Sequence, residues 1–266
     1  MIPSKMLIFI CNIMMHMHKI KNFTFFLLLC LASYSQAQET ETPTQFVYRK
    51  EWSGGATINN RGFGGILRHA IITNNFKKIQ FEIELVKLKH PKEIKVVNPY
   101  YDNAKSYVYG KQNAFYPLRL GVGTQFLVFD KAAKDGVEIS FNIMAGTSIG
   151  LLKPIYLEIL KDNGNPFYLD VVSEKFNKDL HNPANIYGYS GFNKGLNETS
   201  ILLGGYIKSG FTFDWSNKDE KIVLLETGAV IDFYSRKVPI MANFSSDINK
   251  SAFISLYASI LFGKKY

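Results

Sequence analysis

Residue types that usually carry catalysis are sparse in this 266-residue sequence. Beyond residue 37 its histidines stand in three unrelated contexts, which read His69-Ala70-Ile71, His90-Pro91-Lys92 and His181-Asn182-Pro183. None has a serine two residues later, the spacing that would place both side chains on one face of a strand. Both cysteines, Cys11 and Cys30, lie near the N-terminus, and no C-x-x-C occurs. Gly-x-Ser-x-Gly and a phosphate-binding glycine loop are also missing. The sequence therefore predicts no enzyme, no metal site and no cofactor.

A second set of chemically active residues consists of charged side chains that alternate with apolar ones. In segment 137–151 the odd positions from Val137 to Leu151 are mostly apolar, whereas the even positions from Glu138 to Gly150 are polar or small. Such a period of two is typical of a β-strand with two different faces. Nine charged residues fall on polar faces of this kind: Glu51, Glu82, Glu84, Arg119, Glu138, Lys208, Asp214, Glu226 and Asp232.

The elements that must position these charges are eight predicted strands. They span 46–58, 63–72, 79–85, 116–128, 137–151, 201–215, 223–233 and 252–262. Segment 63–72 is glycine-rich, and its sequence does not fix which side chains face which way. Several segments are longer than the usual five or six residues of soluble strands, and about 9–11 tilted residues suffice to cross a bilayer.

The lengths of the links distinguish a membrane barrel from a soluble sheet. Links after the third, fifth and seventh strands are long, at about 90–114, 159–197 and 235–249, whereas the other links are short. In outer-membrane barrels the short turns gather at the periplasmic end and the long loops at the outer end. This pattern favours an eight-stranded antiparallel up-and-down transmembrane β-barrel over an exported β-sandwich or a lipocalin-like barrel. The nine charges would then point into the lumen, where they must pair because unpaired buried charges are costly.

The first 37 residues have the pattern of a secretory signal peptide. A basic start at Lys19 and Lys21 precedes an apolar run, and Ser35-Gln36-Ala37 is a small-x-small cleavage site; translation could also begin at Met15 or Met17. Removing residues 1–37 takes three of the 31 basic residues and no acid, which leaves 28 against 22 and a net charge of +6 for the barrel, residues 38–266. Export of the chain makes nucleic acid an unsuitable partner despite this basic balance.

Over the whole mature chain the sequence resembles the small eight-stranded outer-membrane barrels, the OmpA-membrane-domain and OmpX-like proteins. Four short pieces are similar to an uncharacterised Gram-negative outer-membrane barrel family: 89–93 (KHPKE), 98–100 (NPY), 107–111 (YVYGK) and 153–158 (KPIYLE). The resemblance implies a location in the outer membrane of a Gram-negative bacterium and assembly by the barrel-assembly machinery. It implies no activity.

We therefore expect a non-enzymatic structural, binding or anchoring component with long extracellular loops and a possible protein partner at those loops or at the periplasmic face. The alternatives are a narrow porin-like channel and an outer-membrane enzyme that modifies lipid A. Outer-membrane lipid is the expected surrounding, and Lys87, Lys89, Lys92 and Lys95 are candidate contacts to lipopolysaccharide phosphates, since basic side chains near a membrane surface attract anionic headgroups. Ordinary solvated loop lysines are the alternative explanation.

Overall fold

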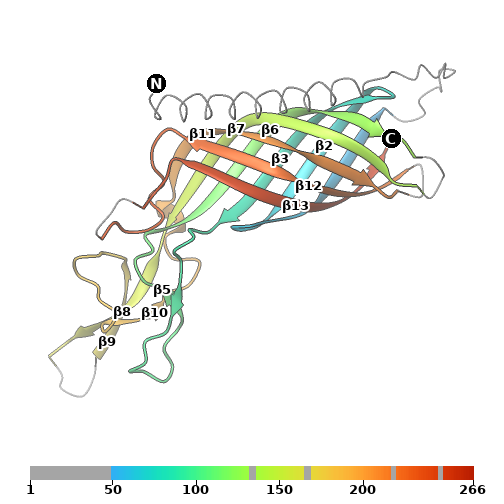
Figure 1. The fold of residues 1–266 in the computed structure, drawn as a ribbon. Coiled ribbons are helices and arrows are strands. Elements are labelled where there is room, and N and C mark those ends of the chain that lie inside the picture. Colours follow the sequence, from blue (N-terminus) through green and yellow to red (C-terminus); the bar gives the residue numbers. More distant parts are fainter. Residues whose placement is uncertain (1–48, 132–135, 165–168, 217–219, 245–247) are drawn as a thin grey trace, which may run out of the picture. The chain divides into compact units, whose positions relative to one another are not determined.

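A computed structural model describes residues 49–131, 136–164, 169–216, 220–244 and 248–266. The predicted signal peptide and residues 38–48 lie outside these ranges. Within them, eight antiparallel strands close into a barrel in the order β1-β13-β12-β11-β7-β6-β3-β2 (Figure 1). Their bounds are β1 Lys50–Asn59, β2 Gly62–Asn74, β3 Lys77–Leu88, β6 Asn113–Phe129, β7 Glu138–Pro154, β11 Ser200–Asp214, β12 Lys221–Tyr234 and β13 Ala252–Lys265. All eight predicted strands are confirmed.

The barrel is an up-and-down meander, because each strand pairs with the next barrel strand along the chain. It closes where the first strand meets the last, with Ala56 opposite Ile260. The three long links all leave the same end of the barrel, where the short β1–β2 turn at Asn60 and Arg61 also lies. The other three short links lie at the opposite end together with the start of β1 and the end of β13. The predicted gathering of the long links at one end is therefore confirmed, and the short β1–β2 turn is the exception to the alternation of short and long links.

The distribution of polar and apolar side chains in this barrel is the reverse of that in a water-soluble barrel. Outward positions are apolar and exposed, as in Leu203, Ile254 and Leu256, each more than 60% exposed. Inward positions carry the charges, and Arg68, Arg119 and Lys208 are at most 2% exposed. A soluble barrel buries its apolar face, so this arrangement contradicts both soluble alternatives.

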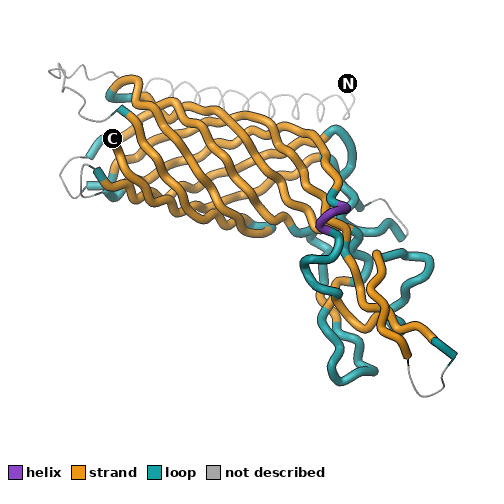
Figure 2. Tube along the Cα trace, turned by 180° about the vertical axis from the view of Figure 1, so that it is seen from behind, coloured by secondary structure: helices purple, strands orange, loops and turns teal. Residues whose placement is uncertain are grey.

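The long links fold into structure of their own, which the sequence does not predict (Figure 2). The link after β3 holds the two-stranded sheet β4 (Lys95–Val96) and β5 (Tyr107–Val108). The link after β7 holds the three-stranded sheet β8 (Tyr156–Asp162), β9 (Leu169–Lys175) and β10 (Ile186–Tyr189), followed by the 3₁₀-helix η1 (Leu196–Glu198). The segment 159–197 is thus not a plain loop. The two small sheets share a buried cluster that includes Tyr107 of β5, Leu157 of β8 and Ile186 of β10, so they form a packed unit.

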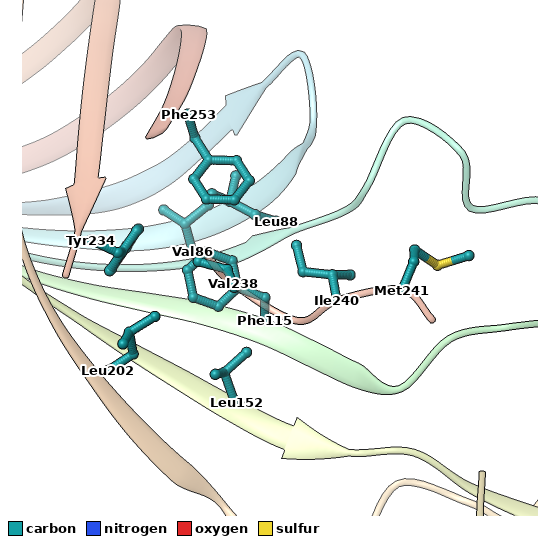
Figure 3. Packing of buried hydrophobic residues seen from close by; sticks show 10 residues of the cluster. All are labelled: Val86, Leu88, Phe115, Leu152, Leu202, Tyr234, Val238, Ile240, Met241 and Phe253. Atoms are coloured by element: carbon teal, nitrogen blue, oxygen red, sulfur yellow. The ribbon is translucent and has the colours of Figure 1, made fainter. Parts of the chain in front are cut away.

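A second buried apolar cluster fills the barrel mouth at the long-link end (Figure 3). Six barrel strands contribute inward side chains to it, among them Phe115 and Leu152. The link after β12 adds Val238, Ile240 and Met241 from above. Backbone hydrogen bonds hold this link in place, with the Gln112 amide donating to the Ile240 carbonyl at 2.9 Å. We call residues 238–242 the cap, because they cover the mouth.

Candidate functional site

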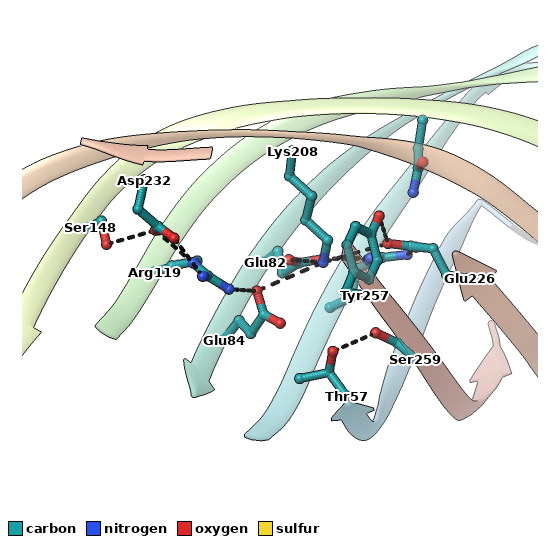
Figure 4. Close-up of polar contacts among 12 residues, drawn as sticks. Thr57, Glu82, Glu84, Arg119, Ser148, Lys208, Glu226, Asp232, Tyr257 and Ser259 are labelled. Carbon is teal, nitrogen blue, oxygen red and sulfur yellow. Dashed lines mark hydrogen bonds and ion pairs between the residues drawn. The ribbon is translucent and has the colours of Figure 1, made fainter. Parts of the chain in front are cut away.

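The lumen holds a network of buried ion pairs below the cap (Figure 4). Arg68 on β2 reaches across the lumen, and its Nη1 lies 2.6 Å from Glu226 Oε2 while its Nε donates to Glu82 Oε2 at 3.0 Å. Lys208 on β11 donates to Glu82 Oε1 at 2.7 Å. The hydroxyl of Tyr257 donates to the other oxygen of Glu226 at 2.7 Å. Side chains from five strands are thereby tied together at one level of the barrel.

A second group of ion pairs lies nearer the cap. Arg119 on β6 binds both oxygens of Asp232, at 2.9 Å through Nε and at 2.7 Å through Nη2. Its remaining nitrogen, Nη1, donates to Glu84 at 2.9 Å. Ser148 also donates to Asp232, at 3.3 Å. Lys208 lies 3.8 Å from Glu84 and so joins the two groups into one network.

This central network places three cations, Arg68, Arg119 and Lys208, among four carboxylates, Glu82, Glu84, Glu226 and Asp232. Moving such charges out of water costs several kcal/mol per ion, roughly, unless geometry and extra hydrogen bonds compensate. Here the guanidinium of Arg119 binds a carboxylate in a two-point manner, which is among the stronger pairings. Removing any one of the three cations would therefore leave uncompensated carboxylates inside the barrel.

The three remaining predicted lumen residues lie toward the short-link end. Glu51 pairs with Lys78 at 2.9 Å, and Asp214 lies 3.5 Å from Lys131. Glu138 accepts a hydrogen bond from Ser140 at 3.2 Å. The structure thus brings six of the nine predicted residues into one network and places the other three at its periphery.

Two cations of the lumen, Arg68 and Lys78, are missing from the sequence-based set. Arg68 lies in the glycine-rich segment 63–72, whose facing the sequence leaves open. A signal for both residues was nevertheless present, because the predicted set contains seven acids and only Arg119 and Lys208 as bases. Buried charges have to be paired, so the excess of acid required further cations. Arg68 lies in the segment of uncertain facing, whereas Lys78 comes directly before segment 79–85 and has the parity of its polar face.

Small residues make room for the large side chains of the lumen. A Cβ atom added at Gly121 would lie 2.1 Å from the Tyr206 hydroxyl oxygen. The Tyr206 ring in turn stands 5.9 Å from the guanidinium carbon of Arg119. Glycine on the inward face of β6 is therefore required for this packing, and the lumen at this level is occupied by side chains.

The four candidate lysines do not form a single patch. Lys87 and Lys95 line one hollow of about 300 Å³ together with Lys111 and Lys153. Lys89 and Lys92 line other hollows, beside the β1–β2 turn and beside Ile248 respectively. The structure therefore divides the predicted set into two pairs and adds two lysines to the first pair.

The three histidines make separate structural contacts. His69 Nδ1 donates to the backbone carbonyl of Glu51 at 3.1 Å, and its ring packs against Trp52 on the outer face of the barrel. Its direct neighbours on the adjacent strands are Trp52 and Phe81, so no cross-strand serine stands beside it. His90 contacts the Ile248 carbonyl at 3.2 Å, and His181 lies 3.4 Å from Glu174.

Among the residues that the structure describes, no group of three or more His, Cys, Asp or Glu side chains is arranged to hold a metal ion. Within the same ranges, no helix is long and apolar enough to cross a membrane.

Comparisons with known proteins find only distant similarity to solved structures. No family model and no curated protein matches the chain. Neisserial surface protein A (NspA) has 10% sequence identity over 82% of this chain and 96% of its own, with a TM-score of 0.35. The N-terminal β-barrel domain of Pseudomonas aeruginosa OprF has 6% identity over 82% of this chain and 98% of its own, with a TM-score of 0.34. The resemblance to small eight-stranded barrels thus rests on the strand pairing of the chain itself, which closes eight antiparallel strands into one all-β barrel.

Proposed function

We propose that this protein is a non-enzymatic outer-membrane barrel of a Gram-negative bacterium that is closed to ions and serves as a structural, binding or anchoring component. Its long links form a folded unit at the outer end, which offers a surface to a partner. The barrel wall anchors this unit in the membrane.

The observation that carries the proposal is the reversed polarity of the barrel. An apolar outer surface of this extent is unfavourable in water and favourable in a bilayer. The opposite arrangement inside, with paired charges and a capped mouth, leaves no reason to expect a ligand cavity or a continuous water path in the lumen. Eight strands enclose a space about as wide as the side chains that fill it.

The surroundings of His69 support the non-enzymatic part of this proposal. A serine-hydrolase mechanism needs a nucleophile within hydrogen-bond reach of the base, and an orienting group on the other side. On the described strands His69 has aromatic neighbours instead, and its Nδ1 is engaged by a backbone carbonyl.

Membrane fractionation combined with a heat-shift gel tests the proposal. The full chain expressed in a Gram-negative host should appear in the outer-membrane fraction. In detergent it should migrate faster before boiling than after it, because a closed barrel resists unfolding. A soluble periplasmic product without a heat shift would refute the outer-membrane assignment.

A further inference from the structure

The hollow that contains Lys87 and Lys95 lies on the outward side of the barrel wall, at the end with the long links. Lys87 on β3, Tyr116 on β6 and Lys153 on β7 all have outward parity. Leu88 pairs with Phe115, which puts Lys87 beside Tyr116, and Lys153 pairs with Ala114 two residues before that tyrosine. Directly below them on the same face come Leu85, Leu118 and Ile149, part of the apolar outer surface.

The folded links form the roof of this hollow. Lys95 comes from β4, Tyr107 and Val108 from β5, and Tyr189 from β10. Burial raises the pKa of Tyr107 and of Tyr189, so both phenols stay neutral over the physiological range. The hollow is thus shaped by the barrel and by both small sheets, and its volume is about 300 Å³.

Positive charge dominates the hollow. Four lysines line it, and one of them, Lys111, is paired with Glu93. Among the described residues, no carboxylate forms an ion pair with Lys87, Lys95 or Lys153. Lys153 is only 2% exposed, and its ammonium lies 4.9 Å from the centre of the Phe192 ring. An ammonium group this deeply buried without a carboxylate partner is costly, and an anion from outside the chain would lower that cost.

We propose that this hollow binds a phosphate group, with Lys87, Lys95 and Lys153 as the residues that hold it. A phosphate carries up to two negative charges and several acceptor oxygens, which suits three unpaired ammonium groups better than a single carboxylate does. If the proposed membrane location holds, the hollow stands just above the apolar belt, at the level where lipid headgroups begin. The phosphate of an outer-leaflet lipid is then the occupant that its position favours, and a soluble phosphate compound is the other source of the same chemistry.

The sequence itself provides a matched control for this inference. Lys89 and Lys92 belong to the same stretch of chain and have the same charge as Lys87 and Lys95, but they line other hollows. If lysines are merely attracted to an anionic surface, substituting either pair should weaken binding of the lipid equally. A specific phosphate site predicts that only the substitution of Lys87 and Lys95 weakens binding.

The experiment measures binding of the full chain in detergent to lipid A that carries its phosphates and to enzymatically dephosphorylated lipid A. Lys87→Gln with Lys95→Gln, and separately Lys153→Met, should weaken binding of the phosphorylated lipid by about tenfold or more. Lys89→Gln with Lys92→Gln should change it by less than about twofold, and Lys153→Arg should retain most of it, because the charge is kept. Equal losses from the two lysine pairs would overturn the site. Equal binding of the two lipids would overturn it as well, unless pyrophosphate binds through the same three lysines.

A second arm identifies the source of the phosphate. Inorganic pyrophosphate is titrated into the lipid-free protein and its variants. Saturable binding that depends on Lys87, Lys95 and Lys153, without any preference for phosphorylated lipid, would keep the phosphate site and assign it to a soluble ligand. Each variant is also checked by the heat-shift gel, so loss of the barrel, which would contradict the proposed function, is separated from loss of the site.

Discussion

Neighbouring residues in one barrel strand meet opposite surroundings. Ile143 on β7 points outward and is 46% exposed, whereas the adjacent Met144 points inward and is 3% exposed. The same alternation continues across the barrel, because the register pairs outward residues with outward residues. Each outward position near the middle of a strand therefore reports directly on the medium around the barrel.

Replacing Ile143 with arginine tests that medium. If the position faces lipid near the midplane, Ile143→Arg should lower the free energy of unfolding by about 2–4 kcal/mol. Ile143→Leu keeps an apolar side chain of the same volume and should change it by less than about 1.5 kcal/mol. Urea titration of the protein folded into vesicles, read by the heat-shift gel, supplies the comparison. Equal stability of the two variants would show that Ile143 does not face lipid.

The ion pairs of the lumen make a second prediction for single residues. Arg119→Met removes the partner of both Glu84 and Asp232, whose side chains are at most 2% exposed. Leaving buried carboxylates uncompensated should cost about 3–5 kcal/mol of stability. Adding Asp232→Asn to this variant removes one of the two orphaned charges, so part of the loss should return. Should the double variant be no more stable than the single one, the pairing seen here would not govern stability.

A lumen residue could be predicted from the sequence where polar and apolar side chains alternate clearly along its strand. Glu82, Glu84 and Glu226 lie in segments with a regular period of two, so their facing was evident from the sequence. Arg68 was missed because glycines at positions 62, 64 and 65 remove the contrast between the two faces of its strand. The identity of each ion pair required the register of strands that are far apart in the chain.

At the scale of elements, the sequence predicts the barrel strands and fails on the links. Most of the eight strands have a period-two pattern, since one face meets an apolar medium and the other a polar lumen, and the glycine-rich segment 63–72 is the exception. Three strands of the links are short, with two residues each in β4 and β5 and four in β10, whereas β8 and β9 have seven each. Patterns of two to four residues carry no periodicity, and the strands of the links are held by packing around residues such as Leu157 and Ile186.

The cap is held by the buried side chain of Asn249, whose amide forms hydrogen bonds with backbone groups of the cap. Asn249 accepts hydrogen bonds from the amides of Ile240 and Met241 at 3.0 and 3.2 Å, and it donates to the Met241 carbonyl at 2.8 Å. Asn249→Ala leaves these buried groups without that partner, which should destabilise the cap by about 1–3 kcal/mol per group. Hydrogen exchange at residues 238–242 should accelerate, while exchange in β6 and β7 stays unchanged.

The neighbouring substitution Lys250→Ala is the control for the cap, because the Lys250 side chain is exposed and only its backbone carbonyl holds Val238. Exchange in the cap of this variant should match that of the wild type. If Asn249→Ala also exchanges like the wild type, the side chain does not hold the cap in place.

Considered as a whole, the molecule is closed twice along the barrel axis. The cap covers the mouth with buried apolar side chains, among them Val238 and Ile240. Below it, Arg119 and then Arg68 cross the lumen to carboxylates on the opposite wall. The two closures use different interactions, apolar packing and ion pairing, so weakening one leaves the other intact.

Conductance in planar bilayers tests this double closure. The purified wild-type barrel should show no stable conductance, because an eight-stranded barrel is about as narrow as its own side chains. Val238→Ser combined with Ile240→Ser should loosen the cap and still leave the bilayer insulating, since the guanidinium groups below remain paired. A reproducible channel in the wild type would replace the closed barrel by the narrow pore. A channel in the cap variant alone would make the cap a gate over a lumen that ions can pass, and the ion-pair network would then not be a second closure.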